Sequence, residues 1–230
     1  MARGVDLVLA GPQTFMASPS RWVQWLSDYK ATITAGPNFA WVLATRALKR
    51  LEGLDLSPLR VGLNGAEPVD ADGVEALVAA GARHGLRPGA VFPAFGMAEV
   101  AIAGTFPEVL SGLRTDHVDQ RVLETEHYAA PAPAGADGVK RLARLGRPVP
   151  GLEMRIVDPS TGDVRQEREV GELQIRGTSV TPGYYKRPEA TAATFDGEWL
   201  RTGDLGYLVD GELVLCGRIK DVIIVAGRNV

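Results

Sequence analysis

The segment LRVGLNGAEPVDADGVEALVAAGARHGLRPGAVFPAFGMAE, residues 59–99, sets one helical pattern between two short apolar runs. The runs at 59–64 and 89–94 predict strands, and residues 72–85 predict a helix that ends at Gly85. Two strands joined through a single helix indicate a parallel pair, because antiparallel neighbours can be joined by a tight turn alone.

The same alternation of strand and helix extends toward the N-terminus. Further strands are predicted at 5–10 and 31–34, and further helices at 18–30, with Ser18 as N-cap and Pro19 in the first turn, and at 38–51. Ligands of a parallel sheet bind beyond the carboxyl ends of its strands, which directs attention to residues 35–38, 64–68 and 94–99.

The pattern changes near Leu145. Short β-rich segments at 154–158, 171–177 and 211–217 are separated by turn sequences, which is typical of a small antiparallel sheet or barrel. We therefore expect an α/β fold in which a mostly parallel sheet flanked by helices is followed by a small antiparallel β subdomain.

Composition excludes several classes of function. The 230 residues carry a formal net charge of −3, so no general attraction to nucleic acid or anionic lipid is expected. Cys216, the single cysteine, excludes an internal disulfide and is expected as a small buried side chain. His84, His117 and His127 fall at no metal-ligand spacing and are expected to be surface or incidental residues. No membrane span and no signal peptide are predicted, and a cytoplasmic protein is expected.

Two loops that follow predicted strands carry residues suited to a planar, charged ligand. In NGAEP, Asn64–Pro68, the small Gly65 and Ala66 would allow close approach of the backbone, although a glycine turn after a strand is also routine. In FPAFGMAE, Phe95 could stack on a base and Glu99 could hold a hard cation such as Mg²⁺. Core packing of Phe95 and a helix-terminal carboxylate at Glu99 are the alternatives.

A second group of candidate residues lies near the C-terminus. Asp204 falls in a predicted tight turn, TGDLG, where a short carboxylate could accept two ribose hydroxyls or, alternatively, bond its own backbone. Arg218 and Lys220 follow the predicted strand and could meet a phosphate, or could be surface charges at a strand end.

Seven short motifs follow one another along the chain: NGAEP (64–68), FGMAE (95–99), GRPVPG (146–151), VGELQIRG (170–177), GYYKRPEAT (183–191), WLRTGDLG (199–206) and GRIKD (217–221). In this order they resemble the adenylate-forming superfamily of acyl-activating, AMP-binding enzymes. The upstream SDYKATITAGPNFAW (27–41) resembles the fatty acyl-AMP ligase branch, with long-chain acyl-CoA synthetases as near relatives.

The resemblance implies a nucleotide site. It implies that Asn64, Gly65, Ala66, Glu67 and Pro68 line the adenine, and that Phe95 stacks on it beside Ala94, Gly96 and Met97, with the Ala94 backbone meeting the exocyclic amine. Glu99 would support Mg²⁺, Asp204 would hold the ribose hydroxyls and Arg218 would contact the ribose or phosphate. Lys220 falls at the implied hinge to a C-terminal domain.

The implied reaction joins a fatty acid to ATP and gives acyl-AMP and pyrophosphate, mostly through positioning and charge neutralisation. The acyl group would pass to the thiol of an acyl carrier protein or polyketide synthase. CoA is the alternative acceptor, and a non-catalytic nucleotide-binding remnant is the alternative function.

The implied organisation is the second part of an α/β N-terminal domain at 1–145, a small β-rich subdomain at 146–217 and a hinge stub at 218–230. The sequence contains neither the family's phosphate loop nor its C-terminal catalytic lysine. We therefore expect this fragment to be inactive in isolation.

A long interval of 47 residues separates Glu99 from Gly146. Within it, residues 112–134 predict a charged helical stretch followed by a Pro/Ala loop. In fatty acyl-AMP ligases, which this sequence resembles, an extra segment in this region is proposed to restrict the movement needed to use free CoA. A tolerated surface insertion is the alternative, because loop lengthening costs little closure entropy.

Overall fold

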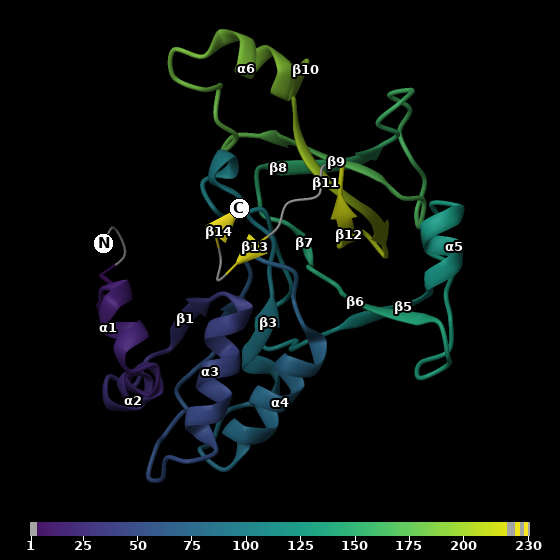
Figure 1. The fold of residues 1–230 in the computed structure, drawn as a ribbon. Coiled ribbons are helices and arrows are strands. Elements are labelled where there is room, and N and C mark those ends of the chain that lie inside the picture. Colours follow the sequence, from purple (N-terminus) through teal and green to yellow (C-terminus); the bar gives the residue numbers. More distant parts are fainter. Residues whose placement is uncertain (1–3, 220–223, 226–227, 230) are drawn as a thin grey trace.

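The computed structural model describes residues 4–219, 224–225 and 228–229 (Figure 1). Lys220, the predicted hinge residue, lies outside the described residues. The first half of the chain contains α1 (Pro12–Ala17), α2 (Ser20–Asp28), β1 (Ile33–Gly36), α3 (Asn38–Leu48), β2 (Val61–Asn64), α4 (Ala71–Ala82), η1 (Pro88–Ala90), β3 (Val91–Pro93), η2 (Ala98–Val100) and β4 (Thr105–Phe106).

The second half contains β5 (Thr115–Asp119), α5 (Gln120–Thr125), β6 (Val139–Ala143), β7 (Arg147–Pro148), β8 (Leu152–Val157), β9 (Gly171–Gly177), α6 (Pro188–Thr194), β10 (Phe195–Asp196), β11 (Trp199–Val209), β12 (Glu212–Arg218), β13 (Ile224–Val225) and β14 (Arg228–Asn229). No helix among the described residues is long and apolar enough to cross a membrane.

The first half forms a parallel sheet in the order β1-β2-β3. Helices α3 and α4 connect these strands and pack against each other beside the sheet (Figure 1). The strand–helix–strand interpretation of residues 59–94 is therefore confirmed. The register pairs Gly36 with Asn64 and Asn64 with Pro93, so all three strands end at the same edge.

Local sequence explains where α4 begins and how it packs. The Asp70 carboxylate accepts the N–H of Asp72 and caps the first turn. Val74 and Leu77, three residues apart, are buried on one face against the first core. Gly81 lies so close to Leu86 that a Cβ at this position would come within 2.5 Å of its side chain.

The predicted strand at 5–10 is wrong. A strand needs a neighbour for its backbone hydrogen bonds, and the described sheet begins at β1, so Leu7 and Leu9 remain 56% and 81% exposed outside any strand. Helix α1 (Pro12–Ala17), which was not predicted, follows instead, and α2 begins at Ser20 with Pro19 as its N-cap residue, one position later than predicted.

The second half is an antiparallel sheet in the order β10-β11-β9-β8, with β12 on β11, which confirms the predicted β subdomain. The predicted turn at Asp204 is wrong, because this residue lies inside strand β11. Turn-like Gly203 instead marks an irregularity in the pairing of β11 with β9, between Arg201 and Leu205.

Residues 112–134 form more than a helix and a loop. Strand β5 pairs with β6, and only residues 120–125 are helical. Val118 and Leu123 are buried in one cluster with Tyr207, whose hydroxyl donates to Asp116 at 2.8 Å. The segment is therefore part of the core of the β half, and the alternative of a surface insertion is wrong.

Among the described residues, three clusters of buried apolar side chains make up the core. The first contains residues between Val23 and Val91, whereas the second and third are built mostly from the β half. The second contains both Ala143 and Leu152, so the proposed domain boundary near residue 145 passes through it. That division stays a proposal.

Two single-residue expectations also meet the structure. His84 is buried, and its ring lies 3.0 Å from the carbonyl oxygen of Leu48, so the expectation of a surface residue is wrong. Helix α4 ends at Ala82, before the predicted stop at Gly85, and His84 in the following turn places its ring against the Leu48 carbonyl of α3. Cys216 is half-buried, with its thiol donating to the Leu205 carbonyl at 3.6 Å.

Candidate functional site

The carboxyl edge of the parallel sheet brings two predicted loops together. The Gly65 N–H donates to the Gly36 carbonyl at 3.4 Å, and the Ala94 N–H donates to the Asn64 carbonyl at 2.9 Å. A Cβ at Gly65 would come within 2.8 Å of the Ala94 carbonyl oxygen, so glycine permits this close approach. Residues 64–68 and 94–99 are neighbours, as the parallel arrangement predicts.

Asn64 carries a buried, incompletely paired amide at this edge. Its side chain is fully buried, and its Nδ2 donates to Asn38 Oδ1 at 2.9 Å. Its Oδ1 has no hydrogen-bond partner among the described residues. Two residues on, Ala66 has a φ of 68°, in the left-handed region that disfavours residues other than glycine. Unsatisfied polar atoms and strained backbone gather at functional sites.

Glu67 has a structural contact within this loop. Its Oε1 accepts the N–H of Phe39 at 2.8 Å, which satisfies one of the free donors at the start of α3. Pro68 is exposed beside it. The structure therefore assigns the Glu67 carboxylate to anchoring α3 on the candidate site.

The second loop places the Phe95 ring in the core. Phe95 is only 8% exposed, belongs to the second apolar cluster and packs on Gly104, where a Cβ would meet its ring at 2.8 Å. This is the core-packing alternative, and stacking on a base stays a prediction. Gly96 passes so near the Ile102 carbonyl that no Cβ would fit, and Met97 packs at the cluster's margin.

Glu99 lies in η2 and has a phenol partner. The hydroxyl of Tyr184 donates to Glu99 Oε1 at 2.8 Å, and this hydrogen bond is the main reason that the pKa of Tyr184 is raised. The Thr181 N–H donates to the Glu99 carbonyl at 2.7 Å. Ala101 and Ile102 follow with φ values of 55° and 75°, and a left-handed β-branched residue is a marked departure from ordinary backbone.

Asp204 and Arg218 form an ion pair across two strands. They are register partners of β11 and β12, and Arg218 Nε lies 2.8 Å from Asp204 Oδ1. Burial raises the pKa of the Asp204 carboxyl, and the Arg218 guanidinium opposes this shift. The bland alternatives for these residues, a self-bonding turn aspartate and a lone strand-end charge, do not describe this geometry.

The structure joins only some of the predicted residues. No hydrogen bond or ion pair within the described ranges links Asp204 or Arg218 to residues 64–68. The parallel and antiparallel halves contact each other at Glu99, through Tyr184 and Thr181, and also where Arg141 of β6 pairs with Asp72 and Glu75 of α4. Placement of Asp204 and Arg218 around the same ligand as Asn64 stays a prediction.

Sequence reasoning indicated residues 35–38 without assigning a role to Asn38, and it missed Tyr184 and Glu172. Asn38 opens α3 directly after Gly-Pro, and Tyr184 lies in the GYYKRPEAT motif, so both had a positional signal. Glu172 is buried at 3% exposure and accepts the Gly203 N–H at 3.2 Å. A glutamate in a strand sequence gives no sign of such a long-range contact.

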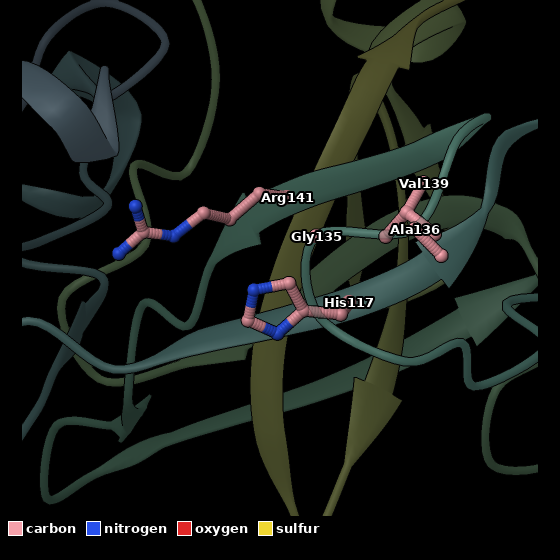
Figure 2. Close-up of a pocket in the computed structure, with 5 residues that line it drawn as sticks. All are labelled: His117, Gly135, Ala136, Val139 and Arg141. Atoms are coloured by element: carbon pink, nitrogen blue, oxygen red, sulfur yellow. The ribbon is translucent and has the colours of Figure 1, made fainter.

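A hollow in the β5–β6 hairpin lies apart from all of these residues. Figure 2 shows its lining, which combines His117, Val139 and Arg141 of the two strands with Gly135 and Ala136 of their connecting loop. The Arg141 guanidinium is already paired with Glu75 and Asp72 of α4. The Arg141 guanidinium is therefore already engaged and not free to bind a ligand in this hollow. We assign the hollow no role.

Comparison with known proteins identifies the family. Residues 1–185 match the family described as AMP-binding enzyme. The chain belongs to this family. The Mycobacterium tuberculosis protein Rv1013 is 45% identical to it over 231 residues, 99% of this chain and 42% of Rv1013. JamA of Moorena producens, a medium-chain-fatty-acid–[acyl-carrier-protein] ligase, is 37% identical over 237 residues, 98% of this chain and 40% of JamA.

Solved structures of AMP-binding relatives have the same fold. A fatty acyl-adenylate ligase from L. pneumophila, in complex with acyl adenylate and pyrophosphate, superposes with a TM-score of 0.87 at 33% identity, over 95% of this chain and 39% of that one. The adenylation domain of a keto acid-selecting NRPS module gives 0.84 at 35% identity, over 95% and 40%. The chain thus spans about 40% of the length of these relatives.

Proposed function

We propose that this chain forms part of a fatty acyl-AMP ligase and supplies the adenosine half of its nucleotide site. The observation that carries the proposal is the buried Asn64 Oδ1, an acceptor without a donor, next to the strained Ala66. The exocyclic amine of adenine is a donor of matching character. The Ala94 N–H already donates to the Asn64 carbonyl, which leaves the Ala94 carbonyl as the backbone group of this residue that can meet the nucleotide. The Ala94 carbonyl oxygen would be the second acceptor for the exocyclic amine.

The ribose and phosphate contacts rest on the ion pair. A carboxylate that is mostly buried and held by one guanidinium keeps lone pairs for vicinal hydroxyls, which fits the role proposed for Asp204. Arg218 would then lie on the ribose or phosphate side. Lys220 is proposed as the hinge residue from sequence alone.

Glu99 is the proposed Mg²⁺ ligand. The described residues contain no group of three or more His, Cys, Asp or Glu side chains that could hold a metal ion. One carboxylate with water and phosphate oxygens suits Mg²⁺, which is usually bound through one or two carboxylates plus substrate phosphates. The Tyr184 hydroxyl, which donates a hydrogen bond to Glu99 Oε1, would either keep this hydrogen bond beside the metal ion or give it up.

The proposed substrate is a fatty acid, and the proposed acceptor is an acyl carrier protein or polyketide synthase thiol. JamA is named for carrier-protein loading, and the L. pneumophila structure holds acyl adenylate. CoA is the competing acceptor. A cytoplasmic location, which the single cysteine favours, stays a prediction.

The decisive experiment uses the longest natural protein that contains this chain. We expect fatty-acid-dependent exchange between ATP and labelled pyrophosphate, loss of exchange on Asn64→Leu, and loading of a carrier protein in preference to CoA. Phe39→Leu, a change at the Glu67-anchored start of α3 that leaves its backbone N–H intact, serves as the control. Absence of exchange with every fatty acid tested would overturn the proposed activity, and robust acyl-CoA synthesis would overturn the proposed acceptor.

A further inference from the structure

Glu172 is a buried carboxylate of β9 that contacts the strand carrying Asp204. Its side chain is nearly inaccessible to water, and within the described part of the chain its ion-pair partner is the partly exposed Arg201. Its Oε2 accepts from Arg201 Nε at 3.2 Å, and the Arg201 side chain is 42% exposed. Its Oε1 accepts the backbone N–H of Gly203 at 3.2 Å. One of its two carboxylate oxygens therefore accepts a hydrogen bond from the backbone next to Asp204.

The contacted backbone is irregular. Pairing of β11 with β9 is interrupted between Arg201 and Leu205, and Gly203 has a φ of 73°. Thr202 supports the same irregularity, because its hydroxyl donates to the Leu173 carbonyl at 2.7 Å and accepts the Asp204 N–H at 3.1 Å. Two side chains thus replace the ladder hydrogen bonds that the irregularity removes.

The irregularity determines where Asp204 lies. A bulge re-aims side chains relative to a regular strand and is common beside functional sites. In this case it leaves Asp204 without a register partner on β9 but paired with Arg218 on β12. A buried carboxylate is unfavourable unless its oxygens are satisfied, so Glu172 and the bulge depend on each other.

We propose that Glu172 is a positioning residue for nucleotide binding: by accepting the Gly203 N–H, it holds the bulge that sets Asp204 against Arg218 for recognition of the ribose hydroxyls. This inference rests on the proposed function, because it assigns a use to Asp204. It concerns the hydrogen bond to the Gly203 N–H, so an uncharged oxygen acceptor at position 172 should preserve the position of Asp204.

The first test is amide hydrogen exchange at Gly203, which does not depend on any nucleotide. Glu172→Ala should speed exchange of this amide at least tenfold, whereas Glu172→Gln, whose amide oxygen can still accept, should leave it within about threefold. Glu212→Ala is the matched control, because Glu212 is a similarly buried glutamate held by Arg114 and Arg144. Unchanged exchange at Gly203 in Glu172→Ala would overturn the inference.

The second test compares binding of AMP with binding of 2′,3′-dideoxy-AMP, which lacks the hydroxyls. The wild-type chain should prefer AMP about tenfold; Glu172→Ala should abolish the preference, and Glu172→Gln and Glu212→Ala should retain it. In an Asp204→Ala background, Glu172→Ala should have no further effect on the preference.

The outcomes separate the two proposals. A wild-type chain without preference would overturn the ribose contact itself, and the inference with it. A wild-type preference that Glu172→Ala keeps would overturn only the positioning role. If Glu172→Ala does not fold, Glu172→Gln decides alone, since loss of preference in that variant would show that charge rather than the accepted hydrogen bond is needed.

Discussion

Arg218 Nε lies 2.8 Å from Asp204 Oδ1, and the two residues face each other across paired strands. Both partners belong to this chain, so the protein itself orders the carboxylate, and less ordering is left for a nucleotide to bring about. The guanidinium also favours the ionised carboxylate in a position where burial alone would raise its pKa further.

Removing the Asp204 carboxylate should weaken nucleotide binding. Asp204→Ala leaves ribose hydroxyls unpaired, which costs on the order of 1–3 kcal/mol, or roughly 5- to 150-fold in AMP affinity. Isothermal titration with AMP measures the effect, and Asp210→Ala, which removes an exposed carboxylate paired with Arg144, is the control. A normal affinity combined with a lower unfolding midpoint would make Asp204 a purely structural residue.

The same position should show a trade between binding and stability. Because burial raises the pKa of Asp204, the folded state favours the protonated carboxyl, and this contribution is lost as the pH rises through the folded pKa. Asp204→Asn should therefore unfold at higher urea concentration than wild type at pH 7. The gain should shrink below the ordinary aspartate pKa of about 3.9; a gain independent of pH would contradict this explanation.

Truncation of Leu123 should destabilise the β half. This residue of α5 is buried in the third core cluster, and cavity formation there should cost about 2–5 kcal/mol. Urea unfolding followed by circular dichroism measures the loss, with the adjacent exposed Glu124→Ala as control. Equal stability of the two variants would return residues 112–134 to the status of a surface insertion.

The burial of Val118 and Leu123 in the third core cluster changes how the role of residues 112–134 should be tested. Deleting the middle of 112–134 would remove buried residues such as Val118 and unfold the β half before it could release any restriction on CoA use. Surface changes on the exposed face of α5 keep the core. If they raise acyl-CoA formation in the longer protein, the segment restricts that step; no change would argue against the restriction.

The thiol of Cys216 should react slowly in the folded chain. Burial raises its pKa to about 11, so only about one molecule in a thousand carries the thiolate at pH 8. Iodoacetamide labelling followed by mass spectrometry should be far slower in buffer than in urea. Native labelling as fast as that of a free thiol would contradict the burial described for this residue.

Local pattern sufficed for the parallel sheet and for the two loops at its edge. Strand and helix periods, and the cap at Asp70, depend on near neighbours in sequence. The strand predicted at 5–10 failed because strand formation needs a partner elsewhere in the fold. The bulge at Gly203 was read as a turn for the same reason: the residue that holds it, Glu172, lies 31 positions away.

Phe95 shows which part of the candidate site could not be predicted from the sequence. An aromatic residue after a strand suits both base stacking and core packing, and only the surrounding residues, such as Gly104, decide which surface its ring meets. The orphaned oxygen of Asn64 was likewise invisible in the sequence, because it is defined by the donors that fail to reach it.

The burial of Val118, Leu123 and Ala129 beneath residues of β11 and β12 has a consequence for descent. Because side chains of this segment fill part of the core of the β half, the segment and the residues that pack around it are constrained to evolve together. Among homologues, substitutions at Leu123 should covary with those around Tyr207 and Val214. Lineages that shorten the segment should carry smaller or more polar residues at the positions that pack against it.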